Sequence, residues 1–259
     1  MASWKQYLKL KFKKYRQEWK LFLVEGKRLC QEAIDSDWTV ESAMISEAFQ
    51  KDPAFPAIEK LITVRNIPLQ VLSTSNFTKL SDTESPQGIV LVMKIPLSIE
   101  PLKKSWRKHP IILILDGIRD PGNLGTIIRT ADWYGVHYIA TSSDSADFFN
   151  SKTIRASMGS LFRVSCQEFS NLPDLVNKLK ENRFKILATS PIAPKLMEEI
   201  RVSFPLAILL GGEAEGISPS LLELSTEIIQ IKKYGQAESL NVAVAAGILL
   251  NHFTALRFK

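Results

Sequence analysis

Apolar and polar residues alternate in short blocks over the first third of the chain. From residue 19, WKLFLVEGKRLCQEAIDS predicts a short strand, a turn at Gly26 and a helix, because the apolar spacing changes from that of a strand to that of a helix. Three further runs have the composition of strands: residues 38–46 (WTVESAMIS), 68–73 (PLQVLS) and 88–95 (GIVLVMKI). With helical stretches between them, this region is predicted to be a small α/β unit.

Stronger apolar runs recur in the second half of the chain. Five of them are typical of strands: residues 111–116 (IILILD), 137–141 (HYIAT), 184–190 (FKILATS), 206–212 (LAILLGG) and 227–231 (EIIQI). The helices predicted between them are residues 124–135, 172–182 and 219–225. Apolar strands that alternate with helices predict a parallel sheet that is covered on both faces. In such sheets, ligands bind beyond the carboxyl ends of the strands.

The segment PLSIEPLKKSWRKHP, residues 96–110, interrupts this pattern. It holds three prolines, and four of its last eight residues are bases, so we interpret it as a linker. A chain of 259 residues is long enough for two domains of unequal size. We therefore predict a smaller α/β domain at residues 1–95, a linker at 96–110 and a larger α/β domain at 111–259.

Composition narrows the class of protein. The chain is 45% hydrophobic and 23% charged, which is typical of soluble proteins. Cys30 and Cys166 lie far apart and the three histidines are scattered, so we expect neither a disulfide framework nor a metal site. No apolar run reaches the length needed to span a membrane, and the start of the chain lacks the apolar segment of a signal peptide. We expect a cytoplasmic protein without a membrane partner.

The net charge of +6 lies entirely in the first twenty residues, which hold seven bases and one acid. Aromatic rings are interleaved with these bases: Trp4, Tyr7, Phe12, Tyr15 and Trp19. A basic segment that carries aromatic rings is typical of nucleic-acid binding, through phosphate attraction and base stacking. An amphipathic helix that packs its aromatic side on its own domain explains the pattern equally well. Both interpretations can hold at once.

The first loop with candidate chemistry is DGIRDPGNLGTIIRTAD, residues 116–132, between a predicted strand and a helix. A Walker A loop needs Lys and then Ser or Thr after Gly122, where this chain has Asn123 and Leu124. The dinucleotide-binding GxGxxG is also absent, because Gly117, Gly122 and Gly125 are spaced five and then three residues apart. Asn123 lies at the tip of the loop. Arg129 lies off the apolar stripe of the helix, where a surface salt bridge is the simplest alternative role.

Two further loops follow strands of the same sheet. In LLGGEAEGISPSLLE, residues 209–223, a strand runs directly into Gly211 and Gly212, which indicates a sharp turn or a close approach to the backbone. In QAESLNVAVAAGILL, residues 236–250, polar side chains crowd the first turn of a predicted helix: Glu238, Ser239 and Asn241. Serine and asparagine side chains commonly cap helices there, so capping is the alternative to a functional role.

Together, in this order, the loops resemble those of SpoU (TrmH-like) RNA ribose 2'-O-methyltransferases, within the SPOUT superfamily. The resemblance covers about residues 16–258, and the stretches FLVEGKRLCQEA and SPQGIVLVM are similar to the family's ribosomal-protein-like substrate-binding domain. IRASMGSLFRV, which starts at residue 154, is also similar to the family. The family's three motifs match Asn123, Gly125 and Arg129; Gly211, Glu213 and Gly216; and Ser239 to Ala245. One departure is Ile231-Lys232-Lys233-Tyr234-Gly235, where the family usually has Ile-Pro-Met-x-Gly.

The resemblance implies a fold, a cofactor and partners. The fold is a C-terminal parallel-sheet domain with a trefoil knot, which is rare among proteins, preceded by the smaller substrate-binding domain. The cofactor is S-adenosylmethionine, which we expect to contact Gly211, Ile231 and Leu240. The partners are RNA and a second copy of the chain, since the family acts as a homodimer with its site at the subunit interface.

The reaction implied by the family is methyl transfer to a ribose 2'-hydroxyl. A hydroxyl is a poor nucleophile until its proton leaves, so a base or a cation that stabilises the oxyanion is needed. Arg129 is our candidate for that role, together with an RNA phosphate, because a guanidinium is too weak a base to act unaided. The other predicted catalytic residues orient Arg129 and the ribose: Asn123, Glu213, Ser239 and Asn241. Ser239 and Asn241 are expected to cap the helix as well as to face the site. No metal is required.

Three alternatives stay open at the level of sequence. The resemblance of the first domain to those of ribosomal RNA enzymes favours ribosomal RNA as substrate over transfer RNA. A non-catalytic RNA-binding protein or ribosome-assembly factor on the same fold is opposed by the intact motifs, although Lys232 and Lys233 favour it. A base-methylating SPOUT enzyme is less favoured, because the Asn/Arg loop is that of the ribose-modifying branch.

Overall fold

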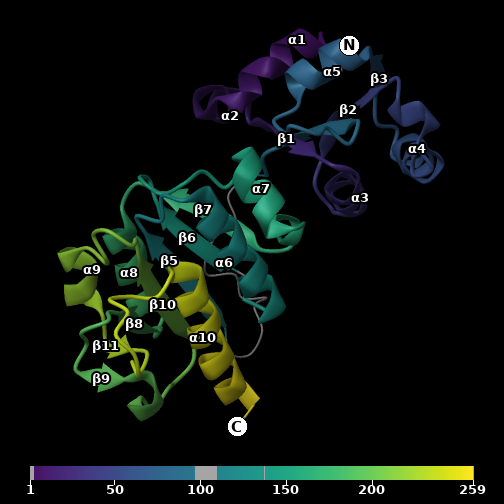
Figure 1. Ribbon diagram of the computed structural model, residues 1–259. Helices are drawn as coiled ribbons and strands as arrows, with labels where there is room; N and C mark the ends of the chain where they lie inside the picture. Colours follow the sequence, from purple (N-terminus) through teal and green to yellow (C-terminus); the bar gives the residue numbers. More distant parts are fainter. Residues whose placement is uncertain (1–2, 97–109, 137, 259) are drawn as a thin grey trace. The chain divides into compact units, whose positions relative to one another are not determined.

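A computed structural model describes residues 3–96, 110–136 and 138–258 and forms two compact units (Figure 1). Unit 1 comprises residues 1–97 together with 149–162, and unit 2 comprises 98–148 together with 163–259. The predicted linker, residues 96–110, lies outside the described residues except at its two ends. Residues 149–162, which the sequence alone assigns to the second domain, group with unit 1. The predicted domain boundaries stay a prediction.

Unit 1 is built on a four-stranded sheet in the order β1-β4-β2-β3. β4 runs antiparallel to both of its neighbours, and β2 and β3 are parallel. Its strands are β1 (Leu21–Glu25), β2 (Val40–Ser46), β3 (Leu69–Leu72) and β4 (Ile89–Lys94). Its helices are α1 (Trp4–Tyr7), α2 (Lys13–Trp19), α3 (Lys27–Asp35), α4 (Phe55–Val64), α5 (Thr74–Leu80) and α7 (Ser151–Ser157), with short 3-10 turns η1 (Leu8–Lys11), η2 (Phe49–Lys51) and η3 (Ser160–Phe162).

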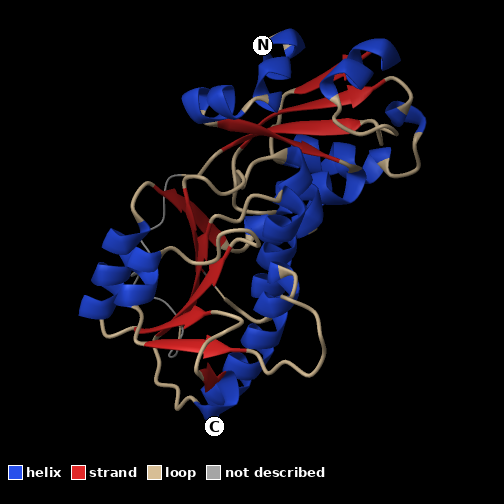
Figure 2. Cartoon of the chain, turned by 60° about the vertical axis from the view of Figure 1, so that its left-hand side comes forward, coloured by secondary structure: helices blue, strands red, loops and turns tan. Residues whose placement is uncertain are grey.

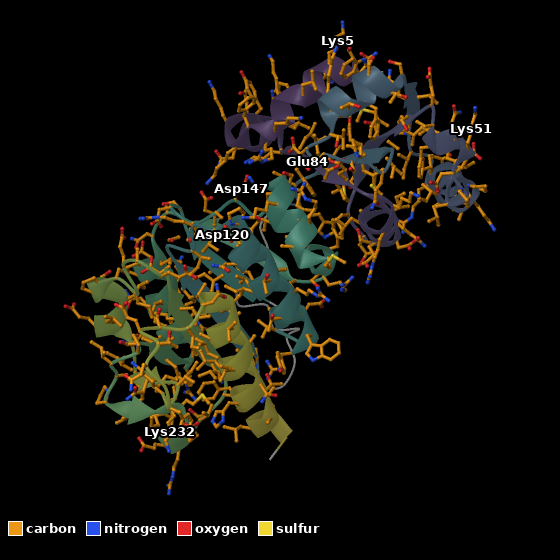
Figure 3. The ribbon with its side chains drawn as sticks, viewed as in Figure 1. Lys5, Lys51, Glu84, Asp120, Asp147 and Lys232 are labelled. Carbon is orange, nitrogen blue, oxygen red and sulfur yellow. The ribbon has the colours of Figure 1, made fainter. Side chains whose placement is uncertain are left out.

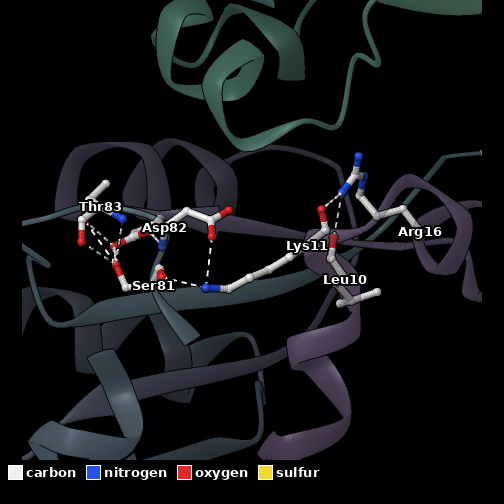
Figure 4. A network of polar contacts seen from close by, with 7 residues as sticks. Leu10, Lys11, Arg16, Ser81, Asp82 and Thr83 are labelled. Carbon is white, nitrogen blue, oxygen red and sulfur yellow. Dashed lines mark hydrogen bonds and ion pairs between the residues drawn. The ribbon is translucent and has the colours of Figure 1, made fainter. Parts of the chain in front are cut away.

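The basic N-terminal segment packs on unit 1. Tyr7 and Leu10 are buried in one apolar cluster with residues of α5 and the sheet. Arg16 is only 4% exposed and donates hydrogen bonds from Nη1 to the carbonyls of Leu10 and Lys11, at 2.7 and 2.9 Å. The Lys11 ammonium lies 3.0 Å from a carboxylate oxygen of Asp82 (Figure 4). The segment therefore packs on its own domain as expected, but as short helices joined by η1 rather than one amphipathic helix, and with Phe12 65% exposed. The RNA interpretation depends on the bases that stay exposed, which are Lys5, Lys9, Lys14 and Lys20.

Residues 149–162 are held in unit 1 by aromatic packing. The ring of Trp38 has three phenylalanine rings around it, with centroids at 6.0 Å for Phe22, 6.3 Å for Phe149 and 5.5 Å for Phe162. The contacts with Phe22 and Phe162 are edge-to-face, the geometry that aromatic quadrupoles favour. This cluster explains why a segment that follows β6 in sequence belongs to the first unit.

Unit 2 contains a parallel sheet of seven strands in the order β7-β6-β5-β10-β8-β11-β9. Helices flank this sheet on both sides, as Figure 2 shows. The strands are β5 (Ile111–Asp116), β6 (Tyr138–Ser142), β7 (Ser165–Phe169), β8 (Lys185–Thr189), β9 (Lys195–Leu196), β10 (Leu206–Gly211) and β11 (Glu227–Gln230). The helices are α6 (Pro121–Trp133), α8 (Leu172–Glu181), α9 (Pro219–Leu224) and α10 (Val242–Ala255), with turns η4 (Met197–Glu199) and η5 (Leu256–Phe258).

The predicted parallel sheet is confirmed, and its burial explains its sequence. Residues 111–115 and 206–210 are all buried, because β5 and β10 lie in the centre of the sheet with helices over both faces. β7 and β9 were not predicted. Both are edge strands and neither is fully buried, so their sequences lack a continuous apolar run. Among the described residues, every helix is too short or too polar to cross a bilayer.

Candidate active site

The candidate site lies where β5 and β10 end side by side. Gly211 pairs with Asp116 in the register of these two neighbouring strands. From β5 the chain continues to β6 on one side, while β10 occupies the other side, so the strand order reverses between them. Open α/β sheets bind ligands at such a reversal, beyond the carboxyl ends of the strands. The loops after β5, β10 and β11 all leave from this edge of the sheet.

Three predicted residues meet there, one from each loop. The Nδ2 of Asn123 donates a hydrogen bond to Oε1 of Glu213 at 3.1 Å. The Nδ2 of Asn241 donates to the same Glu213 oxygen at 3.1 Å and to Oδ1 of Asn123 at 3.0 Å. Residues that are 118 positions apart in sequence thus form one closed hydrogen-bonded cluster, which we call the amide–carboxylate cluster.

Helix caps hold two of these residues in place. Asp120, labelled in Figure 3, accepts a hydrogen bond from the backbone N–H of Asn123 at 2.8 Å and so begins α6. Asn241 accepts from the backbone N–H groups of Ala243 and Val244, at 3.0 and 3.4 Å, and begins α10. Both caps satisfy amides that a helix start leaves without partners. Capping at the start of α10 therefore belongs to Asn241, and Ser239 lies exposed two residues before it.

Counting the donors and acceptors of the cluster shows which of its side chains can still form a hydrogen bond with a substrate. The amide of Asn241 donates both of its hydrogens and its oxygen caps α10, so Asn241 has no capacity left for a substrate. Asn123 keeps one amide hydrogen. Glu213 uses Oε1 twice, and its Oε2 makes no hydrogen bond within the described chain. Glu213 and Asn123 can therefore contact a substrate while Asn241 holds them in place.

The loop after β10 is packed too closely for side chains. A Cβ on Gly211 would lie 2.1 Å from the carbonyl carbon of Gly216, and one on Gly212 would lie 2.3 Å from the backbone oxygen of Gly117. The loop is fixed by hydrogen bonds from Gly212 N to Asp116 O and from Gly216 N to Gly212 O, at 2.8 and 2.9 Å. The sequence predicted a turn or a close approach at Gly211, and the structure shows that the chain's own backbone makes that approach.

Charged side chains that the sequence analysis missed tie the loops together. One nitrogen of Arg119 lies 3.1 Å from Glu215 and 3.5 Å from Asp144, which joins the loops after β5, β10 and β6. The hydrogen bond that Arg119 donates to Glu215 raises the pKa of Arg119, and a hydrogen bond from Ser142 lowers the pKa of Asp144. These exposed pairs contribute little to stability, but they restrict where the loops can move. Their only signal in the sequence is their position just after strands.

The loop after β11 offers backbone groups and apolar side chains. Residues 232–241 are all exposed, and within the described chain the backbone of 233–240 makes no hydrogen bond to other backbone groups. Ile231 is half-buried and Leu240 is 46% exposed. Lys232 extends into solvent (Figure 3), and its ammonium lies 5.1 Å from the centre of the Tyr234 ring. A ligand with polar and apolar parts can therefore form hydrogen bonds with this backbone and apolar contacts with Ile231 and Leu240.

Arg129 lies on α6, apart from the amide–carboxylate cluster. Its neighbours Ile127, Ile128 and Ala131 are buried, as the predicted stripe requires, and Arg129 itself is exposed. In the described part of the chain its guanidinium makes no salt bridge, so the structure does not support the alternative role as a surface ion pair. The fold does not use this charge, and the guanidinium remains available to an anionic substrate.

The amide–carboxylate cluster lies at the reversal of strand order, where open α/β sheets bind ligands. Residues 110–251 match the SpoU rRNA Methylase family, and residues 3–91 match the MRM3-like substrate binding domain. The 23S rRNA (guanosine(2553)-2'-O)-methyltransferase RlmP of Bacillus subtilis is 37% identical over 248 residues, covering 96% of this chain and 94% of that protein.

Solved structures show the same likeness. A protein of Porphyromonas gingivalis, described as an RNA methyltransferase of the TrmH family, superposes with a TM-score of 0.84 at 30% identity and covers 98% of both chains. An rRNA methyltransferase from Sinorhizobium meliloti with AdoMet bound superposes with a TM-score of 0.81 at 28% identity, covering 98% of this chain and 94% of that one.

The chain therefore belongs to the SpoU rRNA methylase family. This confirms the family, the α/β fold class and the enzyme class that the sequence predicted, an RNA 2'-O-methyltransferase that uses S-adenosylmethionine. The roles of the individual site residues stay predictions.

Proposed function

We propose that this protein transfers a methyl group from S-adenosylmethionine to a ribose 2'-hydroxyl of ribosomal RNA. The observation that carries the proposal is the amide–carboxylate cluster, which joins the loops after β5, β10 and β11. Ribosomal RNA is favoured over transfer RNA because the Bacillus subtilis relative, which this chain matches along nearly its whole length, is named for 23S rRNA. The cytoplasmic location expected from the sequence is part of this proposal.

The residues present fit S-adenosylmethionine. The exposed backbone of residues 233–240 offers donors and acceptors for polar parts of the cofactor, and Ile231 and Leu240 offer apolar contact. Gly211 ends β10, at the same edge of the sheet from which the loop after β11 leaves. We assign Gly211, Ile231 and Leu240 to cofactor binding. The bound cofactor supplies an electrophilic methyl group on a sulfonium, so no metal is required for the transfer.

The chain's own residues then have separate tasks. Arg129 stabilises the negative charge that develops on the 2'-oxygen, together with a phosphate of the RNA, because positioned cations are most useful where charge develops. The free Oε2 of Glu213 and the remaining amide hydrogen of Asn123 orient the ribose. Ser239, exposed two residues before Asn241, is assigned as a further ribose contact, and Asn241 positions Glu213 and Asn123 without touching the substrate.

A homodimer and a knotted C-terminal segment complete the proposal. α6 and α10 pack against each other, and apolar side chains on both are exposed: Trp133 is 84% and Val244 is 52% exposed. Exposed apolar residues on two helices that also carry Arg129 and Asn241 support a second copy of the chain at this face. The trefoil knot rests on the resemblance to the family.

S-adenosylhomocysteine should bind the isolated protein and raise its thermal stability. At a ligand concentration of about 100 times Kd, the free energy of unfolding should rise by about 2.7 kcal/mol. Calorimetric titration and thermal unfolding measure the two effects. If millimolar ligand gives neither heat nor stabilisation, the enzyme assignment fails and a non-catalytic RNA-binding role takes its place.

The exposed lysines of the N-terminal segment should contribute to RNA affinity in a salt-dependent way. Replacing Lys5, Lys9, Lys14 and Lys20 by glutamine keeps the packed side of the segment, which a deletion would remove. We expect the slope of log affinity against log salt to decrease by about 0.7 to 0.9 for each phosphate contact that is lost.

The matched control for this prediction replaces four exposed lysines elsewhere, at positions 51, 60, 178 and 180. An equal change of slope in the control would mean that net charge, rather than the N-terminal segment, determines binding. If the slope of log affinity against log salt is unchanged in both variants, the N-terminal segment packs on unit 1 but does not contribute to RNA binding.

A further inference from the structure

Unit 1 has a pocket of its own, at one end of its sheet and separate from the residues of the candidate active site. The pocket has a volume of 540 Å³ and lies where β1 and β2 begin and β4 ends. Hydrogen bonds from Ile95 N to Lys20 O and from Lys94 N to Thr39 O, at 2.8 and 3.0 Å, connect its walls. Ligand pockets commonly range from about 300 to 1,000 Å³, so this one is large enough for a nucleotide.

Two indole rings line the pocket, and contacts hold both of them in place. Trp38 is fixed by the three phenylalanines that surround it. Trp19 packs at 5.4 Å against Tyr15, and the ammonium of Lys9 lies 5.9 Å from its ring centre. Both tryptophans remain partly exposed. Rigid aromatic rings at a partly open surface are suited to stacking, because little side-chain freedom is lost when a flat ligand binds.

The charges around the pocket nearly cancel. Lys20 and Lys94 are opposed by Asp37 and Glu41, and Lys94 lies 3.2 Å from Glu41. This lining does not suit a bare anion or a metal cation. It does suit a flat, neutral ring that carries one phosphate, because the rings contribute most of the affinity and Lys20 can meet the phosphate.

We propose that this pocket binds one unpaired nucleotide of the substrate RNA, with the base stacked on the indoles of Trp19 and Trp38. The inference rests on the proposed function, because it takes the RNA substrate as the source of the nucleotide. Aromatic rings beside basic side chains are the usual means of binding single-stranded RNA, and stacking tolerates any base because every base has a π-face. The basic N-terminal segment adjoins the pocket through Trp19, so phosphates bound along that segment would lead the RNA strand to it.

The test compares two substitutions of Trp19 in the full-length protein. Trp19→Phe keeps an aromatic ring, whereas Trp19→Leu keeps an apolar side chain without one. For Trp19→Leu we expect the Kd for a short single-stranded oligoribonucleotide, and the KM for ribosomal RNA, to rise roughly 5- to 100-fold, the usual effect of losing one base-stacking contact. Trp19→Phe should stay close to wild type, and kcat and the affinity for S-adenosylhomocysteine should not change in either variant.

Three results would overturn the proposal. One is a folded Trp19→Leu protein with wild-type RNA affinity, and another is equal loss in the Phe and Leu variants. The third comes from the unaltered protein: single-stranded RNA should quench its tryptophan fluorescence more than the same sequence in a duplex, and equal quenching excludes stacking even if Trp19→Leu does not fold.

Lys51→Ala is the control, because Lys51 follows the opposite end of β2 (Figure 3). If the protein bound S-adenosylhomocysteine but transferred no methyl group, the proposed function would fail. The RNA-binding and fluorescence measurements would still show whether the pocket binds a nucleotide.

Discussion

Replacing Arg129 by alanine should lower the rate of methyl transfer by a factor on the order of 10² to 10⁴, the usual contribution of one positioned catalytic group. The side chain is exposed and makes no salt bridge in the described chain, so its removal should change the free energy of unfolding by only about ±0.5 kcal/mol. Binding of S-adenosylmethionine should persist, because the residues assigned to it lie in the other two loops. Single-turnover transfer of labelled methyl to ribosomal RNA from a strain that lacks the enzyme measures the effect.

Lysine at this position should restore little activity. It keeps the charge but loses the planar fork with which a guanidinium can engage ribose and phosphate together. Arg201→Ala is the matched control, since Arg201 is also exposed in unit 2 but precedes β10, at the end of that strand opposite to Gly211. Near-normal turnover of Arg129→Ala would exclude Arg129 from the mechanism and make Glu213 and Ser239 the residues to test.

Except for β7 and β9, the strands of both units were predictable because burial determines their composition. β5 and β10 are continuous apolar runs since helices cover both of their faces, and such runs are visible in a single sequence. β7 was not predictable for the opposite reason. It lies at the edge of the sheet, and the run SCQEF has no buried residue. The grouping of residues 149–162 with unit 1 was equally hidden, because it depends on Phe149 and Phe162 meeting Trp38 across a long stretch of sequence.

The candidate site was predictable in its residues but not in its contacts. Each loop taken alone has an ordinary explanation, and for Asn241 that explanation is correct, since it caps α10. The same side chain also joins Asn123 to Glu213, a relation that spacing within one loop cannot show. Capping combined with a place in the site was expected for both Ser239 and Asn241, and the amide of Asn241 both caps α10 and joins the amide–carboxylate cluster. Ser239, three positions from the helix in the same motif, does not cap it, because the cap depends on where the helix begins.

Gly211→Ala should have the second largest effect, because it acts on the backbone that holds the site together. A Cβ at this position would lie 2.1 Å from the carbonyl carbon of Gly216 and 2.4 Å from the nitrogen of Ile217, whereas real Cβ contacts essentially never fall below 3.0 Å. Backbone atoms cannot turn aside as a flexible side chain can. The loop must therefore move, at a cost of about 1 to 3 kcal/mol, as for other overpacked sites.

That movement should affect binding and chemistry together. Glu213 lies two residues after Gly211, so a displaced loop separates its carboxylate from Asn123 and Asn241. A displacement of about 1 Å is enough to lower a rate on the order of 10²-fold, and we expect S-adenosylhomocysteine affinity and single-turnover methyl transfer both to decrease. Gly247→Ala is the control, because its Cβ would meet Thr130 at an ordinary 3.8 Å within α10. It should be neutral or stabilise the helix by about 0.5 to 1 kcal/mol. A Gly211→Ala protein with wild-type cofactor affinity and turnover would show that the tight packing of this loop does not determine the geometry of the site.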